Sequence, residues 1–174
     1  MEELRDVAEK IKRIEIQGAS NVAKAGVKAF ADYLNSIEFS NKDELVPEMK
    51  KAKTILFNAR DTEPALWNCL KLIIGKIKKS ELADETALKD LISKSAEFYV
   101  EQISNAKIAI GRIGARRIAN GMIIMTHCHS SAAEQILIQA KSENRDFHVI
   151  CTETRPKMQG RITAQVLTEA GIII

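Results

Sequence analysis

The chain of 174 residues lacks a long hydrophobic run. No apolar stretch approaches the roughly 18 to 20 residues that a membrane-spanning helix needs. The first residues after Met1 follow a charged helical pattern rather than the apolar core of a signal peptide. The sequence therefore predicts a cytoplasmic protein with no membrane partner.

Cysteine is scarce, and neither sign of charge is in large excess. Cys69, Cys128 and Cys151 are an odd number at wide spacing, which argues against a disulfide framework or a zinc finger, so free thiols are expected. The 26 basic residues are mixed with 23 acidic ones, which leaves a net charge of +3. No basic block points to nucleic acid as a partner, although a local anion site is compatible with this balance.

Residues 1–120 have the pattern of a helical N-terminal domain, because apolar residues recur every three to four positions. Helices are expected over residues 2–15, after the break at 17–21, over 40–58, from residue 64, and from Asp84 to about residue 120. Val27, Phe30, Ala31 and Leu34 form the buried face of the second helix.

Several residues predict where these helices begin and end. Gly18 allows a turn, and either Ser20 or Asn21 can cap the second helix. Ser40 with Asp43 resembles a capping box, while Pro47 suggests that the regular part of the third helix begins later. The remaining signals are Thr62 as N-cap before Pro64, Gly121 as a C-cap, and Gly111 and Gly114 as sites of close packing.

The pattern changes at residue 121. Short apolar runs at 122–125, at 147–151 and from Gly171 alternate with helical patterns at 130–141 and 159–170. This alternation predicts βαβ units and a parallel sheet. The expected fold class is α/β, with the helical domain of 1–120 followed by the first half of a Rossmann-like parallel-sheet domain over 121–174. A doubly wound domain usually has five or six strands, so we expect either a longer protein or completion by a partner.

Two turns are candidates for chemistry, because ligands bind beyond the carboxyl ends of parallel strands. They cover residues 127–131 and 152–156 and should line one crevice. At the first turn, Cys128 is either a thiolate base or nucleophile at a helix N-terminus, or a small buried hydrophobe. His127 and His129 could share a face, but no carboxylate or further histidine lies at ligand spacing, so no metal is expected. His148 lies within a strand and is interpreted as structural.

Other residues favour an anionic ligand. Ser130 and Ser131 either bind phosphate at the helix start or cap the helix. The same two interpretations apply to the small-residue turn Gly18-Ala19-Ser20, as a phosphate turn or as a plain connection. Arg60 and Arg155 lie in loops, where a guanidinium either contacts phosphate in a bidentate manner or is a surface charge.

Taken together, these segments resemble a known family. The matching motifs are Gln17-Gly18-Ala19-Ser20, Arg60, Met125-Thr126-His127-Cys128-His129-Ser130, the stretch from Thr152 to Gly160, and Ile162-Thr163-Ala164. Their order and spacing are similar to those of archaeal ribose-1,5-bisphosphate isomerase, which is grouped with methylthioribose-1-phosphate isomerase and the regulatory subunits of eukaryotic translation initiation factor 2B. The resemblance covers essentially all 174 residues.

The resemblance implies an aldose–ketose isomerase of nucleotide (AMP) salvage that converts ribose 1,5-bisphosphate to ribulose 1,5-bisphosphate without a cofactor. Cys128 would take the proton from sugar C2, and an aspartate expected beyond residue 174 would return one to C1. A homo-oligomer, dimer or hexamer, is expected of the full-length form. The residues implied to bind the phosphorylated sugar are Gln17, Gly18, Ala19, Ser20, Arg60, Ser130, Ser131, Ala132 and Arg155.

The same family includes a second class of function. Its regulatory subunits keep the fold and act through contacts between subunits rather than through chemistry. The resemblance implies that loss of the cysteine marks this non-catalytic branch, so Cys128 favours the enzyme. Gln17 stands where the phosphate turn of the family commonly begins with arginine, which would remove one charge-assisted contact.

Overall fold

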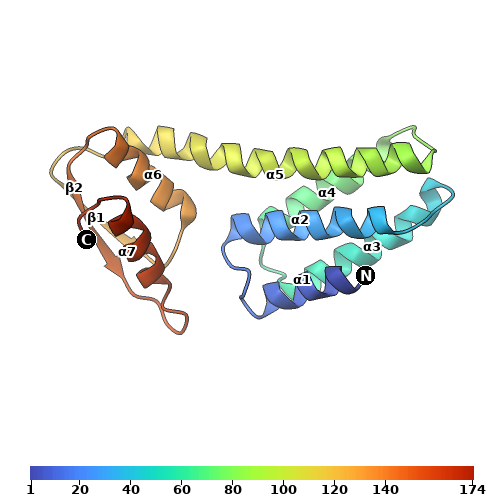
Figure 1. Ribbon diagram of the computed structural model, residues 1–174, viewed down its shortest axis with the longest axis horizontal. Coiled ribbons are helices and arrows are strands. Elements are labelled where there is room, and N and C mark those ends of the chain that lie inside the picture. Colours follow the sequence, from blue (N-terminus) through green and yellow to red (C-terminus); the bar gives the residue numbers. More distant parts are fainter. The chain divides into compact units, whose positions relative to one another are not determined.

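A computed structural model describes residues 1–174 as two compact units, Met1–Ile103 and Ser104–Ile174. The chain passes from one unit to the other within a continuous helix, α5 (Glu85–Ala115) (Figure 1). Seven helices and a parallel sheet confirm the expected α/β fold class. The boundary at residue 120 stays a prediction. No helix combines the length and the apolar character needed to cross a membrane.

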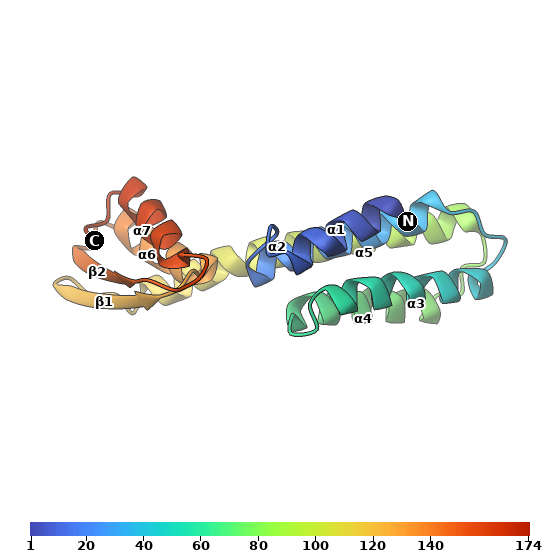
Figure 2. The same cartoon turned by 90° about the horizontal axis from the view of Figure 1, so that it is seen from below.

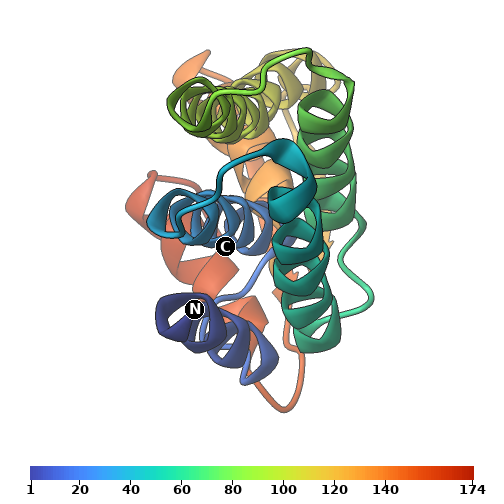
Figure 3. The same cartoon turned by 90° about the vertical axis from the view of Figure 1, so that its right-hand side faces the viewer.

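The first unit is a bundle of α1 (Glu2–Lys12), α2 (Ala19–Ser36), α3 (Lys42–Ala59), α4 (Pro64–Lys79) and the first part of α5. Figure 3 looks along these helices and shows α1, α2 and α5 in one layer, with α3 and α4 in a second. The central helix is α2, which packs against α1, α3 and α4. The Asn35 side chain also donates a hydrogen bond to Ser93 Oγ of α5, at 2.9 Å.

The predicted apolar face of α2 is confirmed as the centre of this bundle. Val27, Phe30 and Leu34 are fully buried, and Ala31 is nearly so. Gly26 lies on the same helix at a close approach to α4, because an added Cβ would lie 2.6 Å from a methyl carbon of Leu66. Burial of large apolar side chains from all five helices therefore holds the bundle together.

The N-cap of α3 and its capping box lie one residue later than predicted. Asn41 rather than Ser40 is the N-cap, and its side chain accepts a hydrogen bond from the Glu44 N–H at 3.1 Å. The Glu44 carboxylate in turn accepts from the Ser40 N–H at 2.8 Å. A box needs a glutamate or glutamine three residues after the cap, and Glu44 has this spacing from Asn41, whereas the residue three after Ser40 is the shorter Asp43. Pro47 lies inside α3 and does not delay its start.

Three other helix limits also differ from the sequence-based expectation. The N-cap of α4 is Glu63, directly before Pro64, rather than the predicted Thr62. Gly18 is the N-cap of α2 with φ +82°, and no side chain caps that end, so neither Ser20 nor Asn21 has the predicted capping role. The first helix ends at Lys12 rather than residue 15, because the chain turns at Ile14 with φ +59°.

Tyr33 of α2 should ionise only at strongly alkaline pH. Its hydroxyl donates a hydrogen bond to the Glu48 carboxylate of α3. Burial, followed by this hydrogen bond and the charge of Glu48, raises the pKa of Tyr33 to about 12. An unfolded tyrosine has a pKa near 10. The neutral form is therefore favoured by folding, and its stabilising contribution is present below about pH 10 and lost as the pH rises from 10 towards 12.

An ultraviolet titration of the phenolate band tests this expectation. Wild type should show a step near pH 12, which Tyr33→Phe removes. Tyr99→Phe is the control and should retain that step, because Tyr99 is the other tyrosine of the chain. Complete ionisation of both tyrosines near pH 10 would contradict the environment described for Tyr33.

The second unit is built on a small parallel sheet. Strand β1 (Met122–His127) pairs with β2 (Phe147–Thr152), which confirms the predicted parallel sheet, and the two strands are paired along their whole length. Ile173 belongs to the run that was expected to form a third strand, and it makes a parallel bridge with His148 of β2. Figure 2 shows α6 (Ser131–Ser142) and α7 (Gln159–Glu169) on one side of this sheet.

The side of the sheet that faces α6 and α7 forms the core of this unit. Phe147 and Val149 are buried there with Leu137 of α6 and Leu167 of α7. The opposite side carries Ile123, Met125 and Ile150, which are exposed large hydrophobic residues. The alternation of the two sets along each strand gives the parallel sheet one covered face and one open face.

The C-terminal end of α5 differs from the prediction. The helix ends at Ala115, and Gly121 is not its C-cap. Gly121 instead has φ +78° and donates its N–H to the Asp146 carbonyl at 2.8 Å as β1 begins. The Arg145 guanidinium donates to the carbonyl oxygens of Ala115, at 2.5 Å, and of Ile118. The Arg145 side chain, from the loop before β2, therefore donates hydrogen bonds to carbonyl oxygens at and just after the end of α5. At a glycine C-cap, main-chain N–H groups usually have this role.

The predicted close packing at Gly111 and Gly114 is confirmed. An added Cβ at Gly111 would lie 2.7 Å from Gln135 Cγ, and one at Gly114 would lie 2.5 Å from Ile136 Cγ1. These two glycines stand one turn apart on α5 and let it approach α6 closely.

Candidate functional site

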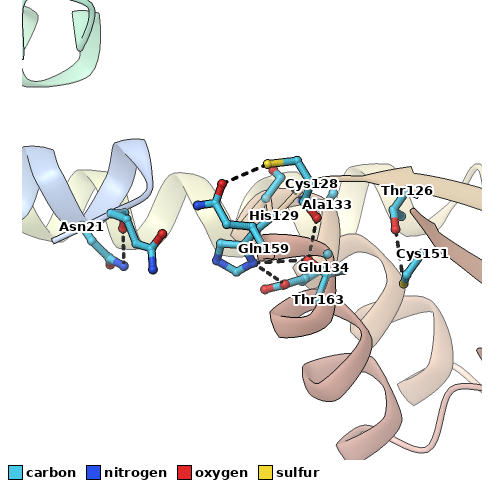
Figure 4. Close-up of polar contacts among 12 residues, drawn as sticks. Asn21, Thr126, Cys128, His129, Ala133, Glu134, Cys151, Gln159 and Thr163 are labelled. Carbon is cyan, nitrogen blue, oxygen red and sulfur yellow. Dashed lines mark hydrogen bonds and ion pairs between the residues drawn. The ribbon is translucent and has the colours of Figure 1, made fainter. Parts of the chain in front are cut away.

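Cys128 lies at the sharp turn between β1 and α6. Its backbone has φ +67°, a left-handed conformation that is uncommon for a residue other than glycine. The side chain is half-buried, and the thiol donates a hydrogen bond to Gln159 Oε1 at the start of α7, at 3.2 Å. Figure 4 shows the thiol pointing toward this amide. The turn therefore places a thiol beyond the carboxyl end of β1, the position at which parallel sheets bind ligands.

The preceding residue, His127, contacts the neighbouring strand rather than the thiol. Its Nδ1 lies 2.7 Å from Thr152 Oγ1, and the Thr152 hydroxyl donates to the Thr126 carbonyl at 3.1 Å. The Thr152 hydroxyl thus lies between the His127 ring and the Thr126 carbonyl. His127 therefore joins the ends of the two strands.

The following residue, His129, points into the unit between α6 and α7. Its Nδ1 lies 2.8 Å from Glu134 Oε1 and 3.3 Å from Thr163 Oγ1 (Figure 4). Glu134 and Thr163 are both buried, with 5% and 3% of their surface exposed. Oε1 of Glu134 has no donor in hydrogen-bonding geometry, so its contact with the imidazole is close but not a well-directed hydrogen bond.

The second predicted turn follows β2 and is organised by Glu153. Its Oε1 accepts from the N–H groups of Thr154, at 2.7 Å, and Gly160, at 3.2 Å. Its Oε2 pairs with Arg161 Nε at 3.1 Å. Gly160 packs directly on the end of β2, since an added Cβ would lie 3.0 Å from the Glu153 Cα. This contact sets the start of α7, and with it Gln159, beside the first turn.

The phosphate candidates of this unit lie at the start of α6. Ser130 is the N-cap, and its hydroxyl accepts a long hydrogen bond of 3.4 Å from the Ala133 N–H. Capping is thus one role that Ser130 fills. Ser131 and Ala132 form the first turn, where N–H groups and the helix dipole favour an anion. Arg155 is exposed in the loop between β2 and α7.

The remaining candidates belong to the first unit. Gly18 starts α2 with a positive φ, and the Asn21 side chain donates to the Gln17 carbonyl at 3.2 Å (Figure 4). Arg60 follows α3, and its Nε lies 3.2 Å from Oε1 of the buried Glu63. This ion pair leaves the two terminal amino groups of the guanidinium for a further acceptor. That these residues and the Cys128 turn form one site stays a prediction.

The structure also brings together side chains that sequence reasoning did not select. Gln159 contacts the thiol, and Glu134 and Thr163 contact His129. Gln159 and Thr163 could have been found, since both lie in motifs that carry the family resemblance, at and just after the start of α7. No feature of the sequence predicts that Glu134 is buried, because a glutamate is expected in the first turn of a helix for its favourable interaction with the helix dipole. No group of three or more His, Cys, Asp or Glu side chains is arranged to hold a metal ion.

Comparison with known proteins places this fold and its turns in one family. The sequence pattern of the Initiation factor 2 subunit family matches residues 15–174. The chain therefore belongs to this family, and the predicted resemblance is confirmed.

The chain is also similar to individual members of this family. Over 99% of its length, the chain is 41% identical to a protein of Thermococcus kodakarensis named ribose 1,5-bisphosphate isomerase, of which it covers 54%. It thus spans about half the length of such curated relatives.

Among solved structures, translation initiation factor eIF-2B of Pyrococcus horikoshii OT3 matches with a TM-score of 0.85 and 25% identity, over 99% of this chain and 58% of that one. The 5-methylthioribose 1-phosphate isomerase of the same organism matches with a TM-score of 0.80 and 23% identity, over 98% of this chain and 50% of that one, and at this identity it speaks for the fold alone.

Proposed function

We propose that this chain provides the proton-abstracting thiol of a sugar-phosphate isomerase that converts ribose 1,5-bisphosphate to ribulose 1,5-bisphosphate in AMP salvage. The observation that carries the proposal is the placement of Cys128 beyond the carboxyl end of β1, in a chain that is 41% identical to a protein named ribose 1,5-bisphosphate isomerase. A half-buried thiol at this position is suited to acid–base chemistry on a bound ligand.

In the proposed reaction, Cys128 removes the proton from sugar C2. The conversion moves one hydrogen from C2 to C1, breaks the bond between C1 and the ring oxygen, and transfers the proton of the C2 hydroxyl to that oxygen as C2 becomes a carbonyl, so a base and an acid are both needed. The base needs a nearby acceptor or donor that holds it toward the substrate, and the Gln159 amide contacts the thiol in this way at 3.2 Å. The acid is the aspartate implied by the family resemblance.

The two phosphates of the substrate would be held at helix starts. The first turn of α6, with Ser130, Ser131 and Ala132, offers N–H groups beside Cys128. The turn of Gln17, Gly18, Ala19 and Ser20 offers a second uncapped helix start, and Arg60 and Arg155 supply positive charge.

The cellular setting is also a proposal. The mixed charges and the family relationship support a cytoplasmic homo-oligomer, without nucleic acid as a partner. Relatives of this fold assemble with one another, since one similar structure is named as the tetrameric eIF2B-beta2-delta2 complex from C. thermophilum.

The test is an assay with ribose 1,5-bisphosphate in deuterated water, run on the polypeptide that contains these residues together with any sequence encoded downstream. Wild type should form ribulose 1,5-bisphosphate and lose the C2 hydrogen to solvent. Cys128→Ser should lower both rates by a factor of about 100 or more, in the range expected for loss of a general base. Cys151→Ser is the matched control and should retain activity, because Cys151 lies within β2.

The alternative is a regulatory subunit of the initiation factor 2B type, which the similarity to eIF-2B of Pyrococcus horikoshii favours. It predicts no turnover by wild type or by either variant. If wild type and Cys128→Ser are equally silent, the isomerase proposal is wrong and the regulatory function becomes the better one.

A further inference from the structure

We propose that His129, paired with Glu134, is a positioning residue that holds Cys128 in its turn through the hydroxyl of Thr163. The proposal rests on the proposed role of Cys128 and adds the residues that keep its thiol in place. All four side chains belong to the second unit and to two consecutive helix starts.

Glu134 carries a buried carboxylate. A carboxylate that is only 5% exposed requires a polar or charged partner beside it. The imidazole of His129 lies in contact with it, with Nδ1 at 2.8 Å from Oε1. Because Glu134 lies in the first turn of α6, this pair ties the imidazole to the helix that follows the cysteine turn.

Thr163 of α7 contributes a buried hydroxyl. Thr163 Oγ1 donates to the Cys128 carbonyl at 3.1 Å, so its oxygen is left to accept from His129 Nδ1 at 3.3 Å. Thr163 is 3% exposed and cannot exchange these partners for bulk water without local opening. The chain of contacts therefore runs from Glu134 through His129 and Thr163 to the main chain of Cys128.

These contacts hold Cys128 in an unusual backbone conformation. Its φ of +67° lies in the left-handed region, which is unfavourable for a residue with a Cβ. Such a conformation persists only where the surroundings determine it. The hydrogen bond to the Cys128 carbonyl comes from α7, the same helix whose first residue, Gln159, accepts from the thiol. Main chain and thiol are thus held by one helix.

The network differs from simple packing in a way that can be measured. If the contacts hold Cys128, their loss should free the half-buried thiol while leaving the rest of the unit folded. Cys151 is a second half-buried thiol of the same unit, on β2, where its Sγ accepts from Thr126 Oγ1 at 3.4 Å. Cys69 of the first unit is buried, and burial raises the pKa of its thiol, so it should react slowest.

The experiment measures alkylation of each thiol by iodoacetamide, with peptide mass analysis to separate the three cysteines. Three variants are compared with wild type: Thr163→Val, Thr163→Ser, and the double variant His129→Leu with Glu134→Leu. The double variant removes both polar side chains together, because removal of one partner would leave the other buried and unpaired.

The proposal expects Thr163→Val and the double variant to raise the Cys128 rate at least threefold, with the Cys151 rate within twofold of wild type. Thr163→Ser restores the hydroxyl and should keep the wild-type Cys128 rate. An unchanged or lower Cys128 rate in Thr163→Val overturns the proposal, and so does an equal rise at Cys151, which would show general loosening of the unit. If the double variant does not fold, the valine and serine pair decides alone.

The readout needs no substrate, so the outcome is independent of the isomerase assay. If the expected alkylation pattern is found but wild type shows no turnover, the positioning role stands and the proposed function is wrong. If wild type shows turnover but alkylation is unchanged in Thr163→Val, the proposed function stands and the positioning role is wrong.

Discussion

Gly160→Ala is expected to destabilise the second unit by about 1–3 kcal/mol, the range for forcing extra volume into a packed site. The physical reason is the contact between the start of α7 and the end of β2. An added Cβ would lie 3.0 Å from the Glu153 Cα and closer still to the Thr152 carbonyl oxygen. These are main-chain atoms, so the clash can be relieved only by moving the strand end or the helix.

Urea unfolding followed by circular dichroism measures the change, with Gly75→Ala as the matched control. Gly75 lies inside α4, and an added Cβ there meets no atom within 4 Å. That substitution should stabilise the protein by about 0.5–1 kcal/mol, the usual gain in helix propensity over glycine. Amide hydrogen exchange should also become faster over residues 147–160 in Gly160→Ala. Equal stability of the two variants would disprove the close approach at Gly160.

Arg145→Met should lower the free energy of unfolding by about 1–3 kcal/mol, because partly buried carbonyl oxygens lose a charged donor. The guanidinium donates to the carbonyls of Ala115 and Ile118 after the end of α5, and its other terminal nitrogen lies 3.1 Å from Glu143 Oε2. Methionine is shorter than arginine but replaces the apolar stem of its side chain, so most of the apolar contacts are kept. The loss therefore measures the polar contacts at the end of α5.

Two further variants identify the source of the effect in the same urea experiment. Arg145→Lys should be intermediate, since an ammonium group cannot reproduce the planar fork of the guanidinium. Arg161→Met removes an ion pair whose arginine side chain is 77% exposed, and exposed pairs contribute only about 0–1 kcal/mol. If Arg145→Met is as mild as Arg161→Met, the helix end is not stabilised by Arg145.

Helices, strands and the parallel sheet were largely predictable from the sequence. The buried positions of α2 recur every three to four residues, and the runs of β1 and β2 are short and apolar, so a local window contains the signal. The helix limits were less predictable. Ser40 and Asn41 are adjacent capping residues, and the choice between them depends on which one finds Glu44 at the right spacing.

The candidate site was predictable in part. The family motif singled out Cys128, and the rule for parallel sheets placed the turns after β1 and β2 at the same edge, where Gln159 contacts the thiol. Conversely, Arg60 was selected as a phosphate ligand without any sign that the buried Glu63 would pair with it. Its partner lies three residues away in a turn whose geometry the local pattern does not describe.

By itself, the sequence determined the class of fold, the order of its helices and strands, the family and the identity of the candidate thiol. Periodicity and motifs are properties of residues that are close in the sequence, so they can be recognised without knowledge of the packing. Only the tertiary structure decided that Arg145 meets the end of α5, that Glu134 is buried against His129, and that Thr163 contacts Cys128. These contacts join residues that different helices, strands and loops carry, and their partners are selected by packing, which no local pattern records.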